Sequence, residues 1–185
     1  MINNKNINVC VFCGSSKGNN PNYLKKAKKL GFCISNNKWN LVYGGGSQGL
    51  MGSLASGFDC SKAEIISVVP RALNIKNILH KNPTKKILVK NLLVRKEKMI
   101  SLSNIIIVLP GGFGTLDELL DIMALNYLGI NNKKIIILNL NSYWDPLKKL
   151  IANMKKNGFI DDVKKSHLYS FNTVDKTIKF IENNL

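Results

Sequence analysis

The chain has 185 residues, of which 45% are hydrophobic, and this length and composition predict one soluble globular domain. No stretch approaches the ~20 apolar residues of a membrane helix, and residues 1–16 lack the apolar segment of a signal peptide, so we expect a cytoplasmic protein without membrane partners. The net charge is +16, but 25 of the 27 basic residues are scattered lysines without interleaved aromatic residues, which favours a solvated surface over a nucleic-acid interface.

Short apolar runs alternate with helical patterns along the chain. Pro21 predicts the first position of a helix, Asp145 a helix N-cap, and Gly129 and Gly158 helix ends. In chain order, the patterns predict a strand at 7–12, a helix at 21–36, a strand at 40–43, a helix at 49–59, a strand at 64–69, a short helix at 74–79, a strand at 86–89, a helix at 91–102, a strand at 104–110, a helix at 115–129, a strand at 134–140, a helix at 145–158, a strand at 168–171 and a helix at 174–184. This rhythm indicates a single Rossmann-like, doubly wound α/β domain over residues 1–185, with a mostly parallel sheet flanked by helices.

Three of the predicted loops are rich in glycine or other small residues, namely 13–18, 44–49 and 110–114. Each follows a predicted strand. Ligands of doubly wound sheets bind outside the C-terminal ends of the strands. We therefore expect the three loops to converge on one ligand site.

The pair Cys10 and Cys13 forms a C-x-x-C pattern within the first predicted strand. Residues three apart on a strand point to opposite faces of the sheet, so the pair is poorly placed for a disulfide or a shared metal. The chain has only two histidines and no second C-x-x-C pattern. We expect buried thiols and no metal site.

The glycine turn at 44–49 matches the G-x-G-x-x-G dinucleotide fingerprint and lies between a predicted strand and a predicted helix. The acidic residue that would bind the adenosine ribose should close the next strand, but Glu64 stands at its other end. The pattern therefore argues against NAD. Either a tight, closely packed turn or a close approach of backbone N–H groups to a ligand explains these glycines.

The stretch PGGFGT at 110–115 predicts a concave loop at the start of a helix, where backbone N–H groups and the helix dipole favour an anion. No lysine follows the glycines as in a Walker A motif, so a single phosphate fits better than a triphosphate with magnesium. Thr115 and Glu118 have the spacing of a capping box, and Asp117 suits the same helix turn. Alternatively, Glu118 faces a sugar attached to the bound phosphate, which would make the ligand a sugar phosphate or a nucleotide.

Only two arginines occur in this lysine-rich chain, Arg71 and Arg95. An arginine in such a background suggests a need for the planar guanidinium group, although a surface charge is the simpler interpretation. Arg95 lies in a predicted helix just before the central strand, and Arg71 follows the C-terminal end of another strand. Both are candidates for the site.

Four stretches together resemble the LOG family, the cytokinin riboside 5′-monophosphate phosphoribohydrolases that were long mislabelled lysine decarboxylases. The stretches are GGGSQGLMG (44–52), VVPRAL (68–73), RKEKM (95–99) and LPGGFGTLDEL (109–119). The resemblance implies that Arg95 and Glu118 form the catalytic pair. It also implies substrate contacts from these two residues and from Ser15, Gly45, Gly46, Lys96, Gly111, Gly112, Gly114 and Thr115.

The resemblance further implies a homodimer without a metal or other cofactor, whose substrate is AMP or an N6-modified AMP. The chain departs from the family pattern before Arg95, where Leu92-Leu93-Val94 replaces a Met-His pair. It also departs in the helix after Glu118, which lacks the usual Trp and Gln. These departures concern base preference more than catalysis.

The leading hypothesis is hydrolysis of the N-glycosidic bond of a nucleoside 5′-monophosphate, giving the free base and ribose 5-phosphate. The alternative is a non-catalytic module of the same fold that binds nucleotides or single-stranded nucleic acid, which the basic charge favours. A pyridoxal-phosphate decarboxylase fits poorly, because no lysine stands out as the Schiff base.

Overall fold

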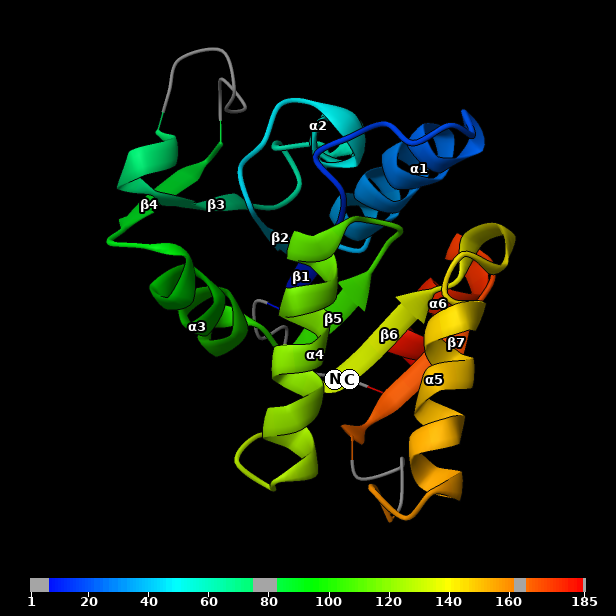
Figure 1. Ribbon diagram of the computed structural model, residues 1–185. Coiled ribbons are helices and arrows are strands. Elements are labelled where there is room, and N and C mark those ends of the chain that lie inside the picture. The colour runs from blue at the N-terminus through cyan, green and yellow to red at the C-terminus, as the bar shows by residue number, and fades with distance from the viewer. Residues whose placement is uncertain (1–6, 75–82, 162–165, 185) are drawn as a thin grey trace.

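A parallel sheet forms the centre of the fold. The computed structural model describes residues 7–74, 83–161 and 166–184, and within these ranges the sheet has the strand order β4-β3-β2-β1-β5-β6-β7 (Figure 1). Each neighbouring pair of strands is parallel. The strands are β1 (Asn8–Phe12), β2 (Asn40–Tyr43), β3 (Ile65–Pro70), β4 (Lys85–Val89), β5 (Ile105–Val108), β6 (Lys134–Leu138) and β7 (Leu168–Phe171).

Helices cover both faces of the sheet. Buried residues of α1, α2 and α6 pack on one face, and those of α3 and α4 pack on the other, where α5 also lies (Figure 1). This arrangement confirms the predicted doubly wound α/β fold. The helices are α1 (Asn22–Asn36), α2 (Gly49–Gly57), α3 (Leu92–Leu102), α4 (Phe113–Tyr127), α5 (Asp145–Lys156) and α6 (Val174–Glu182), with short 3₁₀ turns η1 (Arg71–Leu73) and η2 (Leu140–Ser142).

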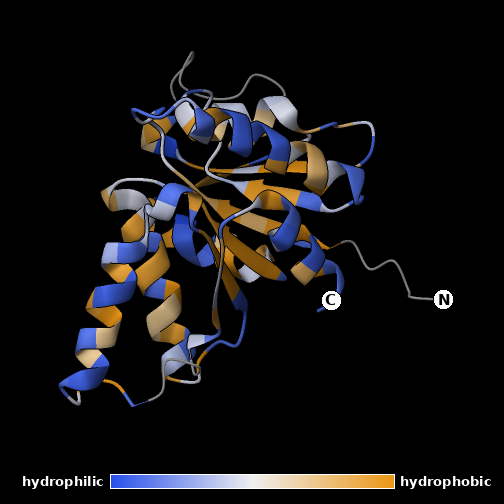
Figure 2. Ribbon diagram, turned by 90° about the vertical axis from the view of Figure 1, so that its right-hand side faces the viewer, coloured by the Kyte–Doolittle hydropathy of each residue, from blue (hydrophilic) through white to orange (hydrophobic). Residues whose placement is uncertain are grey.

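Successive residues of the central strands face opposite cores. In β1, Val9 and Val11 face the core under α1, α2 and α6, whereas Cys10 and Phe12 face the core under α3 and α4. The four residues of β5 are all fully buried. The apolar runs of β1 and β5 are therefore strands buried on both faces, and Figure 2 shows largely hydrophobic strands flanked by helices that carry both hydrophilic and hydrophobic residues.

The strand order reverses between β1 and β5. From β1 the chain proceeds outward through β2 and β3 to β4, and then returns to the other side of β1 to build β5, β6 and β7. The connections on the two sides of this point leave the sheet in opposite directions. A crevice opens there at the C-terminal ends of the strands, where ligands of such sheets bind.

Two predicted helix starts are wrong by one residue. Helix α1 begins at Asn22, so Pro21 occupies the N-cap position. Helix α5 has Trp144 as its N-cap and Asp145 as its first residue. The Asp145 carboxylate accepts a hydrogen bond from the side-chain amide of Asn139 at 2.7 Å. Asp145 therefore binds the residue that follows β6 and does not act as the N-cap of α5.

The predicted helix ends are confirmed. Gly129 and Gly158 have left-handed backbones, with φ of 72° and 77°, just beyond α4 and α5. The short helix predicted at 74–79 lies outside the described residues except at its first position. Of the helices that the structure describes, none has the length and apolar character needed to cross a bilayer.

The contact between α1 and α2 depends on a glycine. A Cβ atom on the buried Gly31 would lie 2.0 Å from the backbone oxygen of Leu54. The two helices can approach this closely only because the side chain is absent. The oxygen belongs to the backbone, so it cannot move aside as a flexible side chain could.

We expect Gly31→Ala to lower the free energy of unfolding by about 2 kcal/mol or more, because the new methyl group forces α1 away from α2. Denaturant unfolding followed by circular dichroism measures this change. Gly114→Ala is the control and should unfold almost as the wild type, since a Cβ there meets nothing within 4 Å. Equal midpoints for Gly31→Ala and the wild type would contradict the close packing.

Candidate active site

The principal cavity lies at the C-terminal ends of β1 and β5, beside the reversal in strand order. Its volume is about 430 Å³, within the range of small-molecule sites. Its walls come from the loops after β1 and β5, the start of α2, the first two turns of α4 and Arg95 of α3, with Tyr23 and Tyr143 at one side. The predicted convergence is therefore confirmed for the loops 13–18 and 110–114, whereas residues 44–49 of the third loop do not line the cavity.

Backbone hydrogen bonds join the loop after β1 to the loop after β5 and to the start of α2. The N–H of Gly14, after β1, donates to the carbonyl oxygen of Pro110, after β5, at 3.1 Å. The carbonyl oxygen of Gly14 accepts from the N–H of Leu50, at the start of α2, at 3.1 Å. Gly49, with φ of 57°, passes so close to Ser15 that a Cβ would lie 2.3 Å from its oxygen. These contacts fix the floor of the cavity.

The N-terminus of α4 forms one end of the cavity. Gly112 is the N-cap, and no side chain caps this helix. The first helical hydrogen bond runs from the N–H of Leu116 to the oxygen of Gly112 at 3.0 Å, so the N–H groups before it have no partner within the helix. Gly112 and Gly114 are exposed and line the cavity. The arrangement is suited to an anion.

The capping box predicted from Thr115 and Glu118 is wrong. Helix α4 begins at Phe113, so Thr115 stands inside the first turn. Its side chain is buried against Gly111, where a Cβ would lie 2.1 Å from the Thr115 Oγ1. Glu118 therefore has no capping role, and its side chain lines the cavity wall one turn beyond the anion-binding end.

Burial changes the acidity of Glu118. Loss of hydration raises the pKa of its carboxyl group to about 7, with a further upward contribution from Asp117, whereas the charges of Arg95 and Lys96 lower it. The carboxyl group is therefore divided between its protonated and ionised forms near neutral pH. Such a perturbed acid in a cavity marks a candidate functional residue.

Arg95 reaches the same cavity from α3. Its guanidinium group lies against Gly44, where a Cβ would be only 1.8 Å from Nη2. A side chain at position 44 would displace it. The buried Nε has no hydrogen-bond partner within the described residues, and such a buried donor is costly unless a ligand or water satisfies it.

Lys96, which was predicted to contact the substrate, does not line the cavity that Arg95 lines. Its Nζ lies 3.0 Å from an Asp117 carboxylate oxygen and 3.6 Å from one of Asp121, and only 12% of its side chain is exposed. Burial lowers the pKa of Lys96, but the hydrogen bond to Asp117 and the attraction of Asp121 outweigh it and raise the pKa above its usual value. Lys96 thus joins α3 to α4 and neutralises the acids beside Glu118.

The other predicted residues divide between the cavity wall and its support. Ser15 and Gly111 line the cavity, whereas Gly45 and Gly46 do not. A Cβ on Gly46 would meet the Met51 side chain at 2.9 Å, so the glycine turn serves close packing around Arg95 and Met51. Arg71, the second candidate arginine, is exposed in η1 and does not line the cavity.

Several lining residues were not among the predicted site residues, and those with large side chains include Tyr23, Met51, Phe113 and Tyr143. Tyr143 follows the C-terminal end of β6, so the rule that selected the glycine loops could also have selected it. Phe113 and Met51 lie within the quoted motifs, but apolar side chains there resemble ordinary core residues. Tyr23 carries no comparable signal in the sequence.

The two cysteines of the C-x-x-C pattern lie apart, as predicted. Cys10 belongs to the core under α3 and α4, and Cys13 to the core under α1 and α2. Burial raises the pKa of both thiols well above the ordinary range, which keeps them neutral. Within the described ranges, no cluster of three or more metal-ligating side chains occurs.

The raised pKa of Glu118 predicts a pH dependence of stability. The native state holds this proton up to about pH 7, whereas the unfolded chain releases it near 4.5, so the native state binds more protons between these values. We therefore expect the free energy of unfolding of the wild type to fall relative to Glu118→Gln as pH rises from 4.5 to 7, by up to about 3 kcal/mol. Urea unfolding of both proteins at several pH values measures the difference. If the free energies of unfolding of the two proteins changed equally with pH, the pKa of Glu118 would not be raised.

Comparison with known proteins gives a family and a fold. The model of a family described as "Possible lysine decarboxylase" matches residues 51–181. Cytokinin riboside 5′-monophosphate phosphoribohydrolase LOG1 of Arabidopsis thaliana is 34% identical over 182 residues, which cover 98% of this chain and 85% of that protein. LOG5 of the same plant, which bears the same enzyme name, is 39% identical over 152 residues, covering 82% of this chain and 67% of that protein.

Among solved structures, the molybdenum cofactor binding protein from the phototrophic bacterium Rippkaea orientalis is similar, with a TM-score of 0.73 and coverage of 98% of both chains. At 21% identity, this likeness establishes the fold alone. The match to the family model includes Arg95 and residues 110–118, and the match to LOG1 extends over 98% of this chain. The chain belongs to the LOG family.

Proposed function

We propose that the protein hydrolyses the N-glycosidic bond of a nucleoside 5′-monophosphate and releases the base and ribose 5-phosphate. The observation that carries this proposal is the position of Glu118, a half-buried carboxyl group one turn beyond an uncapped, glycine-lined helix end in the same cavity. The names of the plant relatives support the same reaction class.

The phosphate binds at the N-terminus of α4 in this proposal. The free N–H groups of the first turn and the positive end of the helix dipole favour its negative charge. The glycines at 112 and 114 keep side chains away, because a Cβ at either position would point into open space. The net charge of +16 also draws anions toward the protein.

The ribose then lies beside Glu118. Hydrolysis breaks the bond between C1′ and the base nitrogen and forms a bond from C1′ to a water oxygen, through a transition state with positive charge on the ribose. An ionised Glu118 stabilises that charge or accepts the proton of the attacking water. Only the deprotonated carboxylate can do either.

Arg95 orients the reacting groups. Its guanidinium group is held against Gly44 and its Nε lacks a protein partner, so it can donate to an oxygen or nitrogen of the ligand. Its positive charge also favours the ionised form of Glu118. Lys96 keeps the neighbouring Asp117 paired and so leaves Glu118 as the carboxyl group available to the ligand.

The preferred base is an N6-modified adenine in this proposal, in line with the cytokinin named for the relatives. The departures before Arg95 and after Glu118 bear on this preference and leave Glu118 and the phosphate loop in place. The expected homodimer and cytoplasmic location stay predictions.

Removal of the carboxylate tests the reaction directly. Glu118→Gln should abolish base release from N6-isopentenyladenosine monophosphate and from AMP, because the amide cannot carry a negative charge. Chromatography of the reaction mixture measures the free base. Glu97→Gln, which changes an exposed carboxylate on α3, is the matched control and should retain wild-type activity. Binding without base release by the wild type would instead favour the non-catalytic alternative.

The pH profile gives an independent check. Since the ionised form of Glu118 is the active one, kcat/KM should rise with pH through about 7, the pKa of the group in the free protein. Steady-state kinetics in a series of buffers measures the profile. A profile that is flat between pH 5 and 8 would exclude Glu118 as the titrating group.

The phosphate loop is tested through a glycine. We expect Gly112→Ala to raise KM for AMP far more than it lowers kcat, because the new methyl group crowds the phosphate without touching the protein. Its unfolding midpoint should match that of the wild type. An unchanged KM would show that the phosphate of AMP does not bind at this loop.

A further inference from the structure

The principal cavity continues past the phosphate loop. A second, shallower cavity of about 680 Å³ adjoins it, and both are lined by Gly18, Tyr23 and Tyr143. Arg95 and Glu118 line the first cavity and not the second. No acidic residue occurs among the described residues that line the second cavity, so a ligand can extend there without meeting a carboxylate.

Two tyrosine rings form the wall that the cavities share. The ring centroids of Tyr23 and Tyr143 are 6.1 Å apart, with the planes nearly perpendicular, and Tyr143 packs in the same manner on Trp144 at 5.0 Å. The Tyr143 hydroxyl donates a hydrogen bond to the backbone oxygen of Gly111 in the phosphate loop. Yet 40% of Tyr143 is exposed. A fixed aromatic ring therefore stands beside the loop with surface left to contact a ligand.

The backbone before Tyr143 is unusual. Asn141 and Ser142 both have left-handed conformations, with φ of 52° and 59°, which residues other than glycine seldom adopt. The side-chain amide of Asn22, in α1, donates to the Asn141 Oδ1 at 3.5 Å. On the other side, Gly18 has φ of 69°, and a Cβ there would lie 3.0 Å from the Tyr23 ring. Strained conformations persist where the surroundings hold them, and they are concentrated at ligand sites.

We propose that Tyr23 and Tyr143 form a second ring-binding subsite, which accepts a nucleoside esterified to the 5′-phosphate of the nucleotide bound at Glu118. The ligand class is a dinucleoside monophosphate whose 3′ nucleotide occupies the principal cavity. The phosphate between its two nucleosides lies at the α4 N-terminus, and the 5′ base stacks on the tyrosine pair. The inference rests on the proposed position of the phosphate, and it adds a ligand class that the proposed function does not require.

Equilibrium binding tests the subsite. The full chain carrying Glu118→Gln, which prevents turnover, is titrated with AMP and with adenylyl-(3′→5′)-adenosine in a calorimeter. Stacking of one base on aromatic side chains predicts about 5- to 100-fold tighter binding of the dinucleotide. Tyr23→Leu or Tyr143→Leu on this background should lower the affinity for the dinucleotide much more than the affinity for AMP, so that most of that advantage is lost.

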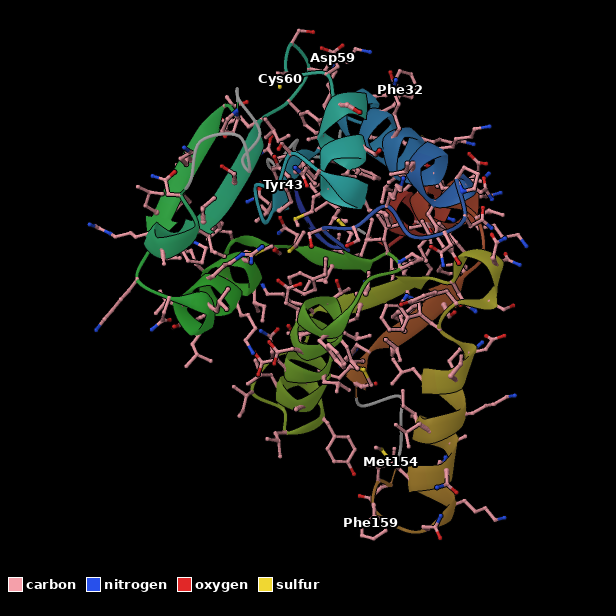
Figure 3. All side chains as sticks on the ribbon, turned by 45° about the horizontal axis from the view of Figure 1, so that its top comes forward. Phe32, Tyr43, Asp59, Cys60, Met154 and Phe159 are labelled. Atoms are coloured by element: carbon pink, nitrogen blue, oxygen red, sulfur yellow. The ribbon has the colours of Figure 1, made fainter. Side chains whose placement is uncertain are left out.

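Two further variants separate the rings from other effects. Tyr143→Phe removes the hydroxyl bond to Gly111 but keeps the ring, so the advantage of the dinucleotide should persist. Phe159→Leu alters an aromatic ring that is 83% exposed beyond the far end of α5 (Figure 3), and it should also have no effect. If the dinucleotide keeps its tighter binding in Tyr143→Phe and Phe159→Leu but loses it in Tyr23→Leu and Tyr143→Leu, the result supports stacking on the two tyrosine rings.

Equal affinities of AMP and the dinucleotide would overturn the subsite. It would also be overturned if Tyr23→Leu and Tyr143→Leu weakened the binding of AMP as much as the binding of the dinucleotide, since the rings would then contact the base of the mononucleotide itself. The failure of the proposed hydrolysis gives a different result. In that case the wild type would release no base from AMP, whatever the binding comparison showed.

Discussion

One helix supplies both an anion-binding end and a buried acid. In α4, Glu118 comes three positions after Thr115, a rise of about 4.5 Å along the helix axis, so the distance between the two features is set by helix geometry. The dipole and free N–H groups of the first turn favour a negative ligand, while burial resists a negative charge on Glu118. A ligand with a phosphate at one end and an uncharged ring at the other satisfies both conditions.

The rest of the fold holds this helix in position. A parallel sheet directs the N-terminus of α4 to the edge where its strands end, and the reversal of strand order beside β1 leaves a crevice there. Arg95 enters the crevice from α3 because Gly44 makes room for its guanidinium group. Lys96, the next residue, binds α3 to α4 through Asp117 and Asp121. Adjacent residues of α3 thus have separate tasks, one in the cavity and one between the helices.

Much of the fold could be predicted from the sequence, because its signals are local. Four-residue apolar runs such as Ile105–Val108 require burial on both faces, and alternation with helical patterns requires parallel strands. The convergence of the loops after β1 and β5 on one cavity followed from that topology alone. The positions of Gly129 and Gly158 were also correct, since a left-handed helix end depends on the glycine itself.

Several details of the site could not be predicted from the sequence, because they depend on how its side chains pack. The capping-box spacing of Thr115 and Glu118 is the same whether or not the helix starts at Thr115, and the fit of the Thr115 side chain against Gly111 decides the matter. The position of Lys96 depends on the distance between α3 and α4. The role of Tyr143 depends on a hydroxyl contact to Gly111 from a different loop. Each detail depends on how segments pack against one another in the folded chain, which local sequence patterns do not show.

In the proposed site, the α4 N-terminus and Glu118 bind opposite parts of one ligand. Nuclear magnetic resonance of labelled protein can follow the amides of Gly112, Gly114 and Thr115 and the carboxyl carbon of Glu118 during titration with ribose 5-phosphate and with inorganic phosphate. With ribose 5-phosphate, the amides and the carboxyl group should respond with the same Kd, and with inorganic phosphate the amides should respond much more strongly than the carboxyl group. Amides that do not respond, or a Glu118 signal that is the same with ribose 5-phosphate as with inorganic phosphate, would show that the two groups do not bind one ligand.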